Sequence, residues 1–441
     1  MLIFTPRRPR LGAPFVGCCL LAAAFAAVWT GAVSDPMIAL VPFPFALVVG
    51  LTRRYGPVVA GLLPAISIVL DGVLVSMNRQ TPIRISTVIV LLLIWSTVVS
   101  TTRFHRRLTA IAGWFIVVVV TNFVIIALPT GHAVEIPILA LFIEGVIVCF
   151  VVASLAPDPE LVLVGIVVSA LVTSYFSFFP EYRIGGRPYA LGLDPNYLGT
   201  VTAVGIAALA TLCRVRRDAR FLVLLVPMIG GLVQIQGRSS ALAAGVGLVA
   251  AMSLSASRLR SFIILGTLAA FITVGALAGV HPGYGAFTER RIDTVESAEV
   301  RERIFQVNVE AFESAPFEGI GLGVIGQRTE QVPTLNQAVV SHSEFLRIAA
   351  ELGLLGLLGA LLLFGVPLVR GISSDARRSP PALMWPALAS MLVSMAFLNV
   401  LDNAQLATLV VTMAGTGWSS IALERRPAVP KNARIAGVKF S

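Results

Sequence analysis

Three short stretches of this chain place Arg and His residues where they can do chemistry. Arg238 lies in QGRSS, Arg301 and Arg303 lie in VRERIF, and His342 lies in SHSEF. An Arg side chain is permanently charged and donates hydrogen bonds in a planar fork that matches phosphate oxygens. A His side chain titrates near neutral pH, so it accepts a proton readily. These residue types predict a site that binds an anionic group and takes up a proton.

Each of these residues also has a simpler interpretation. Arg238 lies in a tight turn between two apolar runs, where an Arg at a helix end can extend its charge into the aqueous interface. Arg301 is flanked by Glu299 and Glu302, with which it can form ion pairs on a solvated face. His342 can be an interfacial histidine with satisfied hydrogen bonds. Residue type alone leaves these alternatives open.

A polar stripe follows the third stretch, because Glu344, Arg347 and Glu351 recur at intervals of three and four residues. That spacing puts all three on one face of a helix. Charges within an apolar helix are costly and usually face the interior of a bundle. We therefore expect the stripe to face inward, and we expect Ser341 or Ser343 to cap the helix that carries it.

The elements that position these residues are membrane helices. The chain has 441 residues, of which 56% are hydrophobic and 13% are charged, with a mean hydropathy of +0.88. Soluble domains carry about 25% charged residues, so the composition excludes a soluble enzyme, a disordered chain and a nucleic-acid-binding module. Continuous apolar runs favour helices over an alternating β-barrel pattern. The fold class is therefore an all-α polytopic membrane helix bundle.

Apolar runs long enough to approach a membrane span recur along most of the chain. We count about 14 candidates and expect about 12–14 transmembrane helices. The runs lie near 11–33, 36–51, 55–76, 83–100, 107–128, 136–156, 160–179, 196–212, 220–236, 239–255, 261–280, 344–369, 382–400 and 404–423.

The charge distribution predicts the orientation of these spans. The net charge is +10, and twice as many Lys and Arg residues fall on the side that holds both termini as on the other side. Because cytoplasmic loops of membrane proteins are enriched in Lys and Arg, both termini are expected to be cytoplasmic. Arg238, Arg301 and His342 then all lie on the outer side.

The outer side carries the informative loops. Segment 180–195 is rich in Gly and Pro, which marks an ordered turn-rich loop, and 281–342 is a long acidic loop. Within it, the apolar spacing at 300–314 predicts an amphipathic helix that ends before Pro316. We divide the chain into N-terminal transmembrane helices over 1–180, a membrane core over 181–423 that includes this loop, and a basic cytoplasmic tail over 424–441.

Two acids lie within apolar runs and no metal-binding motif is present. Asp71 and Glu144 can relay protons or ions, or each can pair with a polar group of a neighbouring helix, and the sequence leaves both open.

The four cysteines show no disulfide or zinc spacing. No phosphate-binding glycine loop, zinc-protease or serine-hydrolase motif occurs, so we expect neither a metal nor a cofactor.

Four motifs, taken in order, resemble the O-antigen ligase and O-antigen polymerase superfamily. The resemblance covers about 185–370 and depends on the order and spacing of the motifs as well as the long outer loop. The motifs are LDPNYLG (193–199), GRSSALAAGVGL (237–248), RERIFQVNVEAFESAPFEGIGLG (301–323) and HSEFLRIAAELGLLG (342–356).

The resemblance implies a membrane glycosyltransferase with a helical fold of the C class. Its partners would be the lipid bilayer, a polyprenyl-diphosphate-linked glycan donor and a glycan or lipid-glycan acceptor, with no nucleic acid. The transfer would be inverting and metal-independent, at the outer face of the plasma (inner) membrane of a bacterium. Polymerisation and ligation of surface polysaccharide use the same motifs, so both stay open.

The resemblance also implies roles for individual residues. Arg238 and Arg301 would bind the diphosphate and stabilise it as it leaves, and Arg303 adds a second arginine to the same motif. His342 would take the proton of the acceptor hydroxyl. Asn196, in LDPNYLG, is a further candidate for substrate binding. Two points lie outside the family pattern. Glu344 is expected to orient His342 because it is close in sequence, and Phe305 stands where the family usually has tryptophan.

A transporter, such as a flippase for lipid-linked oligosaccharide, is the alternative function. Such transporters are commonly built from two similar halves with charge along a central path. Here the halves differ and the polar residues gather toward one face, which favours the transferase.

Overall fold

The computed structural model describes residues 55–76, 85–99, 106–127, 129, 136–184, 187–254, 300–330, 343–374 and 379–419. Nearly all of these residues are helical, so the all-α class predicted from the sequence is confirmed. The strands in this part of the chain form one short antiparallel hairpin of β1 (Arg183–Ile184) and β2 (Arg187–Pro188).

Five helices are long and apolar enough to cross a membrane. They are α5 with its π-helical extension (Arg106–Ile126), α6 (Ile136–Leu155), α7 (Pro159–Ser177), α8 (Pro195–Arg216) and α14 (Glu344–Ser373). Several such helices in one chain make it a polytopic helical membrane protein.

Further helices complete the described part of the chain. They are the segment Tyr55–Asp71, which ends in the π-helix η2 (Ile66–Asp71), then α3 (Gly72–Ser76), α4 (Ile85–Val99), η3 (Phe123–Ala127), η6 (Pro180–Tyr182), η7 (Ala219–Leu224), α9 (Leu225–Ile235), α10 (Arg238–Ser253), an unlabelled helix over 300–314, α13 (Val324–Glu330), α15 (Pro380–Met395) and α16 (Ala404–Ser419). Every predicted apolar run within the described residues coincides with helix. The runs 11–33, 36–51 and 261–280 lie outside them.

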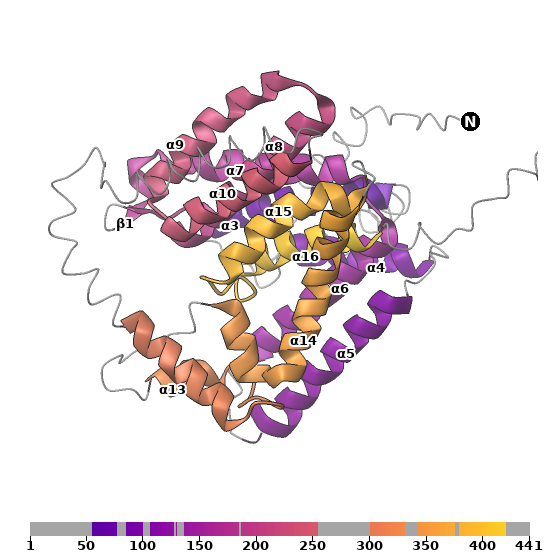
Figure 1. The fold of residues 1–441 in the computed structure, drawn as a ribbon, viewed down its shortest axis with the longest axis vertical. Coiled ribbons are helices and arrows are strands. Elements are labelled where there is room, and N and C mark those ends of the chain that lie inside the picture. Colours follow the sequence, from indigo (N-terminus) through magenta and orange to yellow (C-terminus); the bar gives the residue numbers. More distant parts are fainter. Residues whose placement is uncertain are drawn as a thin grey trace, which may run out of the picture.

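The helices pack as one bundle in which α8 lies between α7 and α10 (Figure 1). Small residues allow these close approaches. A Cβ added to Gly205 of α8 would lie 2.0 Å from the Cβ of Ala170 in α7, and one added to Gly247 of α10 would lie 2.5 Å from that of Ala207 in α8. Membrane helices associate through such small-residue contacts because lipid supplies little hydrophobic driving force.

Two of the long helices begin at Asp-Pro pairs. The Asp158 side chain accepts a hydrogen bond from the backbone N–H of Glu160 at the start of α7. The Asp194 side chain accepts from the N–H groups of Asn196 and Tyr197 at the start of α8. An acidic N-cap followed by Pro at the first helical position satisfies otherwise unpaired N–H groups and presets the helical φ angle. These caps determine where α7 and α8 begin.

Helix α14 is two helical pieces. Gly353 has φ 67° and ψ −169°, which breaks the helix between 344–352 and 354–373. The sequence-based expectation of one continuous span over 344–369 is therefore wrong at this residue. We call residues 344–352 the half-helix. It begins at the end of the bundle where the loops described next converge.

One end of the bundle gathers loops that are far apart in sequence, and we call it the site end. Tyr197 donates a hydrogen bond from Oη to the carbonyl of Asn399 at 3.0 Å, and Gln405 donates from Nε2 to the carbonyl of Leu191 at 3.3 Å. The segments that meet there are 187–199, 235–240, 316–323, 343–353 and 396–405.

Candidate functional site

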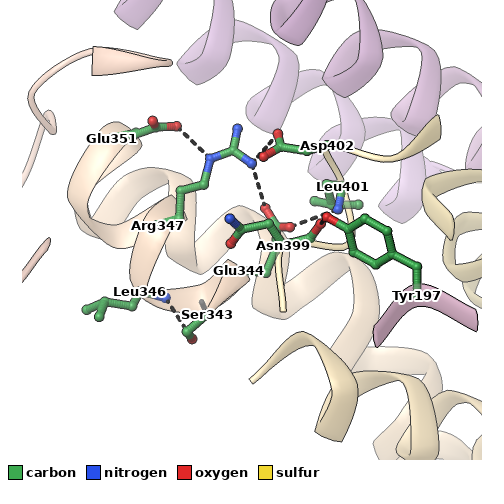
Figure 2. A network of polar contacts seen from close by, with 9 residues as sticks. All are labelled: Tyr197, Ser343, Glu344, Leu346, Arg347, Glu351, Asn399, Leu401 and Asp402. Carbon is green, nitrogen blue, oxygen red and sulfur yellow. Dashed lines mark hydrogen bonds and ion pairs between the residues drawn. The ribbon is translucent and has the colours of Figure 1, made fainter. Parts of the chain in front are cut away.

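A cluster of four charged residues lies where the start of α14 meets the 396–403 loop, and three of them, Glu344, Arg347 and Glu351, are buried (Figure 2). Arg347 pairs through Nε with Oε2 of Glu351 at 3.0 Å, through Nη1 with Oε1 of Glu344 at 3.6 Å, and through Nη1 with Asp402. The Arg347 and Glu344 side chains are 0% exposed and that of Glu351 is 1% exposed. We call these four residues the charge cluster. The prediction that this polar stripe faces the bundle interior is confirmed.

Arg347 is committed to the fold by these contacts. Its guanidinium also lies over the ring of Phe142 in α6, 5.6 Å from the ring centroid, a distance that allows a cation–π interaction. A buried charge needs such partners, because removing it from water costs several kcal/mol. The cluster therefore holds the half-helix against α6 and the 396–403 loop. Because Arg347 is buried and paired, it is not available to bind an anion at the surface.

Glu344 connects the charge cluster to α8. Its Oε2 accepts a hydrogen bond from the backbone N–H of Leu401 at 2.8 Å. Two residues earlier, the Asn399 carbonyl accepts from Tyr197. The Glu344 carboxylate thus has two partners, the guanidinium of Arg347 and the N–H of Leu401, and both belong to the bundle. A role of Glu344 in orienting the neighbouring histidine stays a prediction.

The start of the half-helix is capped by a serine. Ser343 Oγ accepts a hydrogen bond from the N–H of Leu346 at 3.4 Å, so Ser343 fulfils the capping role expected of it or Ser341. His342 lies outside the described residues, and it directly precedes Ser343 in the chain. The position of the half-helix therefore governs where the chain delivers His342.

A second group of polar residues lies where α8 and α10 begin, and we call it the α8–α10 corner. Asn196, in the first turn of α8, accepts a hydrogen bond at Oδ1 from Nη2 of Arg187 at 3.3 Å. The same nitrogen lies 3.5 Å from the carbonyl of Ile235 at the end of α9. Arg183 donates to Oε1 of Gln234 at 2.7 Å. The β1–β2 hairpin is thus fastened over the starts of both helices.

Arg238 is the first residue of α10 and is exposed. The preceding turn is tight because Gln236 adopts a left-handed conformation with φ 55°. Ser240 packs so closely on α8 that a Cβ added to Gly199 would lie 2.3 Å from its Oγ. The tight turn predicted around Arg238 is confirmed, whereas its placement on the outer side stays a prediction. The turn brings this arginine to the same corner as Asn196.

Arg301 and Arg303, two of the arginines of the long loop, lie in a helix over 300–314, as predicted. We call it the arginine helix. Arg301 and Arg303 are exposed, and Arg303 donates from Nη1 to Oε1 of Gln306 at 3.1 Å. Ile304 and Ala311 are buried, which confirms the amphipathic pattern. Asn308, on the same helix, is 0% exposed and donates from Nδ2 to the carbonyl of Ile304 at 2.8 Å.

The segment after the arginine helix forms a joint with the break in α14. Ile320 N–H donates to the carbonyl of Ala350 at 3.0 Å and Gly321 N–H to that of Glu351 at 3.1 Å, while Leu354 N–H donates to the carbonyl of Pro316 at 2.8 Å. The break leaves these backbone groups without helical partners, and the segment 316–323 supplies them. We call this arrangement the joint.

Two glycines allow the joint to close. A Cβ added to Gly353 would lie 2.1 Å from the carbonyl oxygen of Phe317, and one added to Gly319 would lie 2.2 Å from that of Glu351. Both glycines have positive φ angles, 67° and 74°, which disfavour other residues. The PFEGIGLG and ELG motifs therefore fit together as one structural unit.

Asp71 and Glu144 both pair with the start of α4. Asp71 accepts hydrogen bonds from the N–H and Oγ of Ser86 at 3.3 and 2.5 Å, and Glu144 accepts from Oγ1 of Thr87 at 3.0 Å. These contacts favour the structural alternative over a proton or ion relay.

The structure joins the candidate residues in two ways. The α8–α10 corner contains Asn196 and Arg238, and Tyr197 links it to the loop that bonds Glu344. The joint connects the arginine helix to the half-helix. No contact between Arg238 and the arginine helix occurs among the described residues. The sequence interpretation missed Asp402, Tyr197 and Asn122, although an Asn within the apolar run of α5 was a visible signal.

Comparison with known protein families assigns this region. Residues 223–361 match the family model described as O-Antigen ligase. This segment is similar to the O-antigen ligase family. The match includes Arg238, Arg301 and Arg303 as well as the half-helix and the joint, whereas Asn196 precedes it. No curated protein matches the chain. This match lies within a polytopic helical bundle. Together they support a glycan-handling function of the O-antigen ligase type at a membrane.

Proposed function

We propose that this protein is a membrane glycosyltransferase of surface polysaccharide assembly. It takes a glycan from a polyprenyl-diphosphate carrier and transfers it to a saccharide or lipid-glycan acceptor at the outer face of the bacterial inner membrane. The observation that carries this proposal is the family match over 223–361, because that segment contains Arg238, Arg301, Arg303 and His342.

Exposed arginines support the binding of the donor. Arg238 begins α10 and Arg301 begins the arginine helix, and both side chains are open to solvent. A diphosphate presents several anionic oxygens, and Arg binds such oxygens through two parallel N–H donors. The apolar faces of the membrane helices suit the polyprenyl chain. In this proposal Arg303 adds positive charge beside Arg301, and Asn196 contributes a polar contact near Arg238.

The transfer step follows from these roles. The acceptor hydroxyl attacks the anomeric carbon of the donor glycan, and the hydroxyl proton passes to the imidazole of His342. A new C–O bond forms as the bond between the anomeric carbon and the diphosphate oxygen breaks. The bonding electron pair leaves with the polyprenyl diphosphate, whose added negative charge Arg301 and Arg238 stabilise. Direct displacement inverts the anomeric configuration and requires no metal.

Deletion of the gene followed by electrophoresis of the surface glycans tests the proposal. The deleted strain is complemented with the wild type, Arg301→Ala, His342→Ala, or Arg328→Ala as a control. Arg328 is an exposed arginine in α13, outside the proposed site. We expect the wild type and Arg328→Ala to restore the glycan and the other two variants to behave like the deletion.

The pattern of the lost glycan separates the two reactions. If single repeat units remain in place of long chains, the protein is a polymerase. If long chains persist on the polyprenyl carrier, it is a ligase. An unchanged glycan profile, or full complementation by Arg301→Ala and His342→Ala at normal protein levels, would contradict the proposal and favour the transport alternative.

A further inference from the structure

Asn122 is a buried polar residue at the last position of α5, where the α-helix passes into the π-helix η3. Its side chain is 5% exposed. It lies in the apolar sequence VVVVTNFVII, about 100 residues before the O-antigen ligase segment begins. A buried amide in such a helix is costly unless its donors and acceptor are all satisfied.

The amide of Asn122 bonds both sides of the joint. Nδ2 donates to the carbonyl of Glu318 at 2.7 Å and to that of Glu351 at 2.9 Å, and Oδ1 accepts from the N–H of Leu322 at 2.9 Å. Glu318 and Leu322 belong to the segment after the arginine helix, whereas Glu351 belongs to the half-helix. One side chain of α5 therefore holds two other parts of the chain together.

This set of contacts requires two N–H donors and one acceptor oxygen on the same planar group, which a side-chain amide provides. An Asp at the same place has two acceptors and no donor when ionised. It would place a carboxylate oxygen against the carbonyls of Glu318 and Glu351, which accept hydrogen bonds and do not donate them. A Gln keeps both donors and the acceptor on a side chain one methylene longer. The chemistry of Asn122 can thus be removed or retained with little change in size.

The parts held by Asn122 carry the two ends of the proposed reaction. The arginine helix presents Arg301 to the leaving diphosphate and leads directly into the segment 316–323. The half-helix begins at Glu344 and is capped by Ser343, which follows His342, the residue proposed to take the proton of the acceptor. A bond-making group and a leaving-group stabiliser must keep a defined separation, because displacement by about 1 Å can cost about 100-fold in rate.

We propose that Asn122 is a positioning residue that sets the arginine helix relative to the half-helix during glycan transfer. This inference rests on the proposed function. Asn122 touches neither donor nor acceptor and acts through the backbone of Glu318, Leu322 and Glu351. The N-terminal helices, which the family match does not cover, thereby contribute directly to the geometry of the site.

Kinetics of the purified full-length protein, with a lipid-linked glycan donor, test this proposal. We expect Asn122→Asp to lower kcat by about 100-fold while KM for the donor changes by less than about threefold. Asn122→Gln is expected to recover most of that loss. The control is Thr211→Val, which removes a buried hydrogen bond from Thr211 Oγ1 to the carbonyl of Ala207, well away from the joint. We expect it to leave kcat unchanged.

A distance measurement separates positioning from general loss of stability. Spin labels are placed at Gln306, which is exposed on the arginine helix, and at Leu346, which is partly buried on the half-helix, with the native cysteines replaced by alanine. We expect a narrow distance distribution in the wild type and in Thr211→Val, and a broad or shifted one in Asn122→Asp. If Asn122→Asp fails to accumulate, Asn122→Ser, which keeps one short donor, is measured in the same way.

The outcomes separate this inference from the proposed function. Wild-type kcat and an unchanged distance distribution in the Asp or Ser variant would overturn the positioning role while the transferase stands. A loss of kcat in Thr211→Val as large as in Asn122→Asp would also overturn it. If the wild-type protein transfers no glycan, the proposed function fails, and the distances alone decide whether Asn122 sets the two elements.

Discussion

The candidate substrate-binding arginines and the arginine of the charge cluster occupy two opposite environments. Arg238, Arg301 and Arg303 are exposed at helix starts, whereas Arg347 is 0% exposed and paired with three carboxylates. An exposed guanidinium can exchange water for phosphate oxygens at little cost. A buried one that is already paired cannot, because an anion would have to displace its partners. Burial and pairing thus separate the arginines that can bind a substrate from the arginine that maintains the fold.

The two environments also differ in what holds them together. The charge cluster fastens the half-helix to the bundle through side chains. The joint fastens the same half-helix to the arginine helix through backbone hydrogen bonds, with Asn122 as the main side-chain contribution. Substitutions in the cluster should therefore act mainly on stability, and those in the joint on stability and geometry together.

The largest loss of stability is expected for Arg347→Ala. It leaves Glu344 and Glu351 buried without their cation, and removing one partner of a buried ion pair costs about 3–5 kcal/mol. The matched control is Arg216→Ala, which breaks an ion pair with Glu160 at 3.1 Å whose side chains are 44% and 34% exposed. Exposed pairs contribute about 0–1 kcal/mol. Thermal unfolding in detergent compares them, and equal losses would contradict the distinction between the two arginines.

A smaller loss is expected for Gly353→Ala. The added Cβ meets the backbone of Phe317, and an L residue at this positive φ is strained by about 1–3 kcal/mol. In the same helix, a Cβ added to Gly365 meets nothing within 4 Å. Gly365→Ala should therefore be neutral or stabilising by up to about 1 kcal/mol. If both variants unfold at the same temperature, the joint is not closed as described.

The smallest loss is expected for Tyr197→Phe. It removes one hydrogen bond to the carbonyl of Asn399, worth about 0.5–1.5 kcal/mol. The ring stays in place, so the loss should leave the shape of the loop unchanged. Thermal unfolding measures this loss. A loss as large as that of Arg347→Ala would show that the single hydrogen bond stabilises the fold as much as the charge cluster does.

Hydropathy predicted most of the described fold. The runs 55–76 and 136–156 and the described part of the run 404–423 coincide with helix, because a membrane helix needs a continuous apolar segment. The helix over 300–314 was predicted, and it ends before Pro316, where its apolar spacing ends. The inward stripe of Glu344, Arg347 and Glu351 followed from the cost of charge in an apolar helix.

What the sequence could not supply was the pairing between distant segments. Asp402 contacts the half-helix from the 396–403 loop, and Tyr197 bonds that loop from α8. No local spacing relates either residue to the half-helix. The break at Gly353 was hidden because a glycine within an apolar run is compatible with a continuous membrane helix. Its positive φ becomes visible only when the segment 316–323 lies against it.

The most direct test of the account is turnover of the purified protein with Arg301→Ala. Removing one donor that stabilises a developing anion costs about 100- to 1,000-fold in kcat. We expect a loss of that size with an unchanged unfolding temperature, because Arg301 is exposed and its side chain makes no ion pair or hydrogen bond with the residues that the structure describes. Wild-type turnover in Arg301→Ala, or a loss explained entirely by unfolding, would contradict the assignment of Arg301 to the leaving diphosphate.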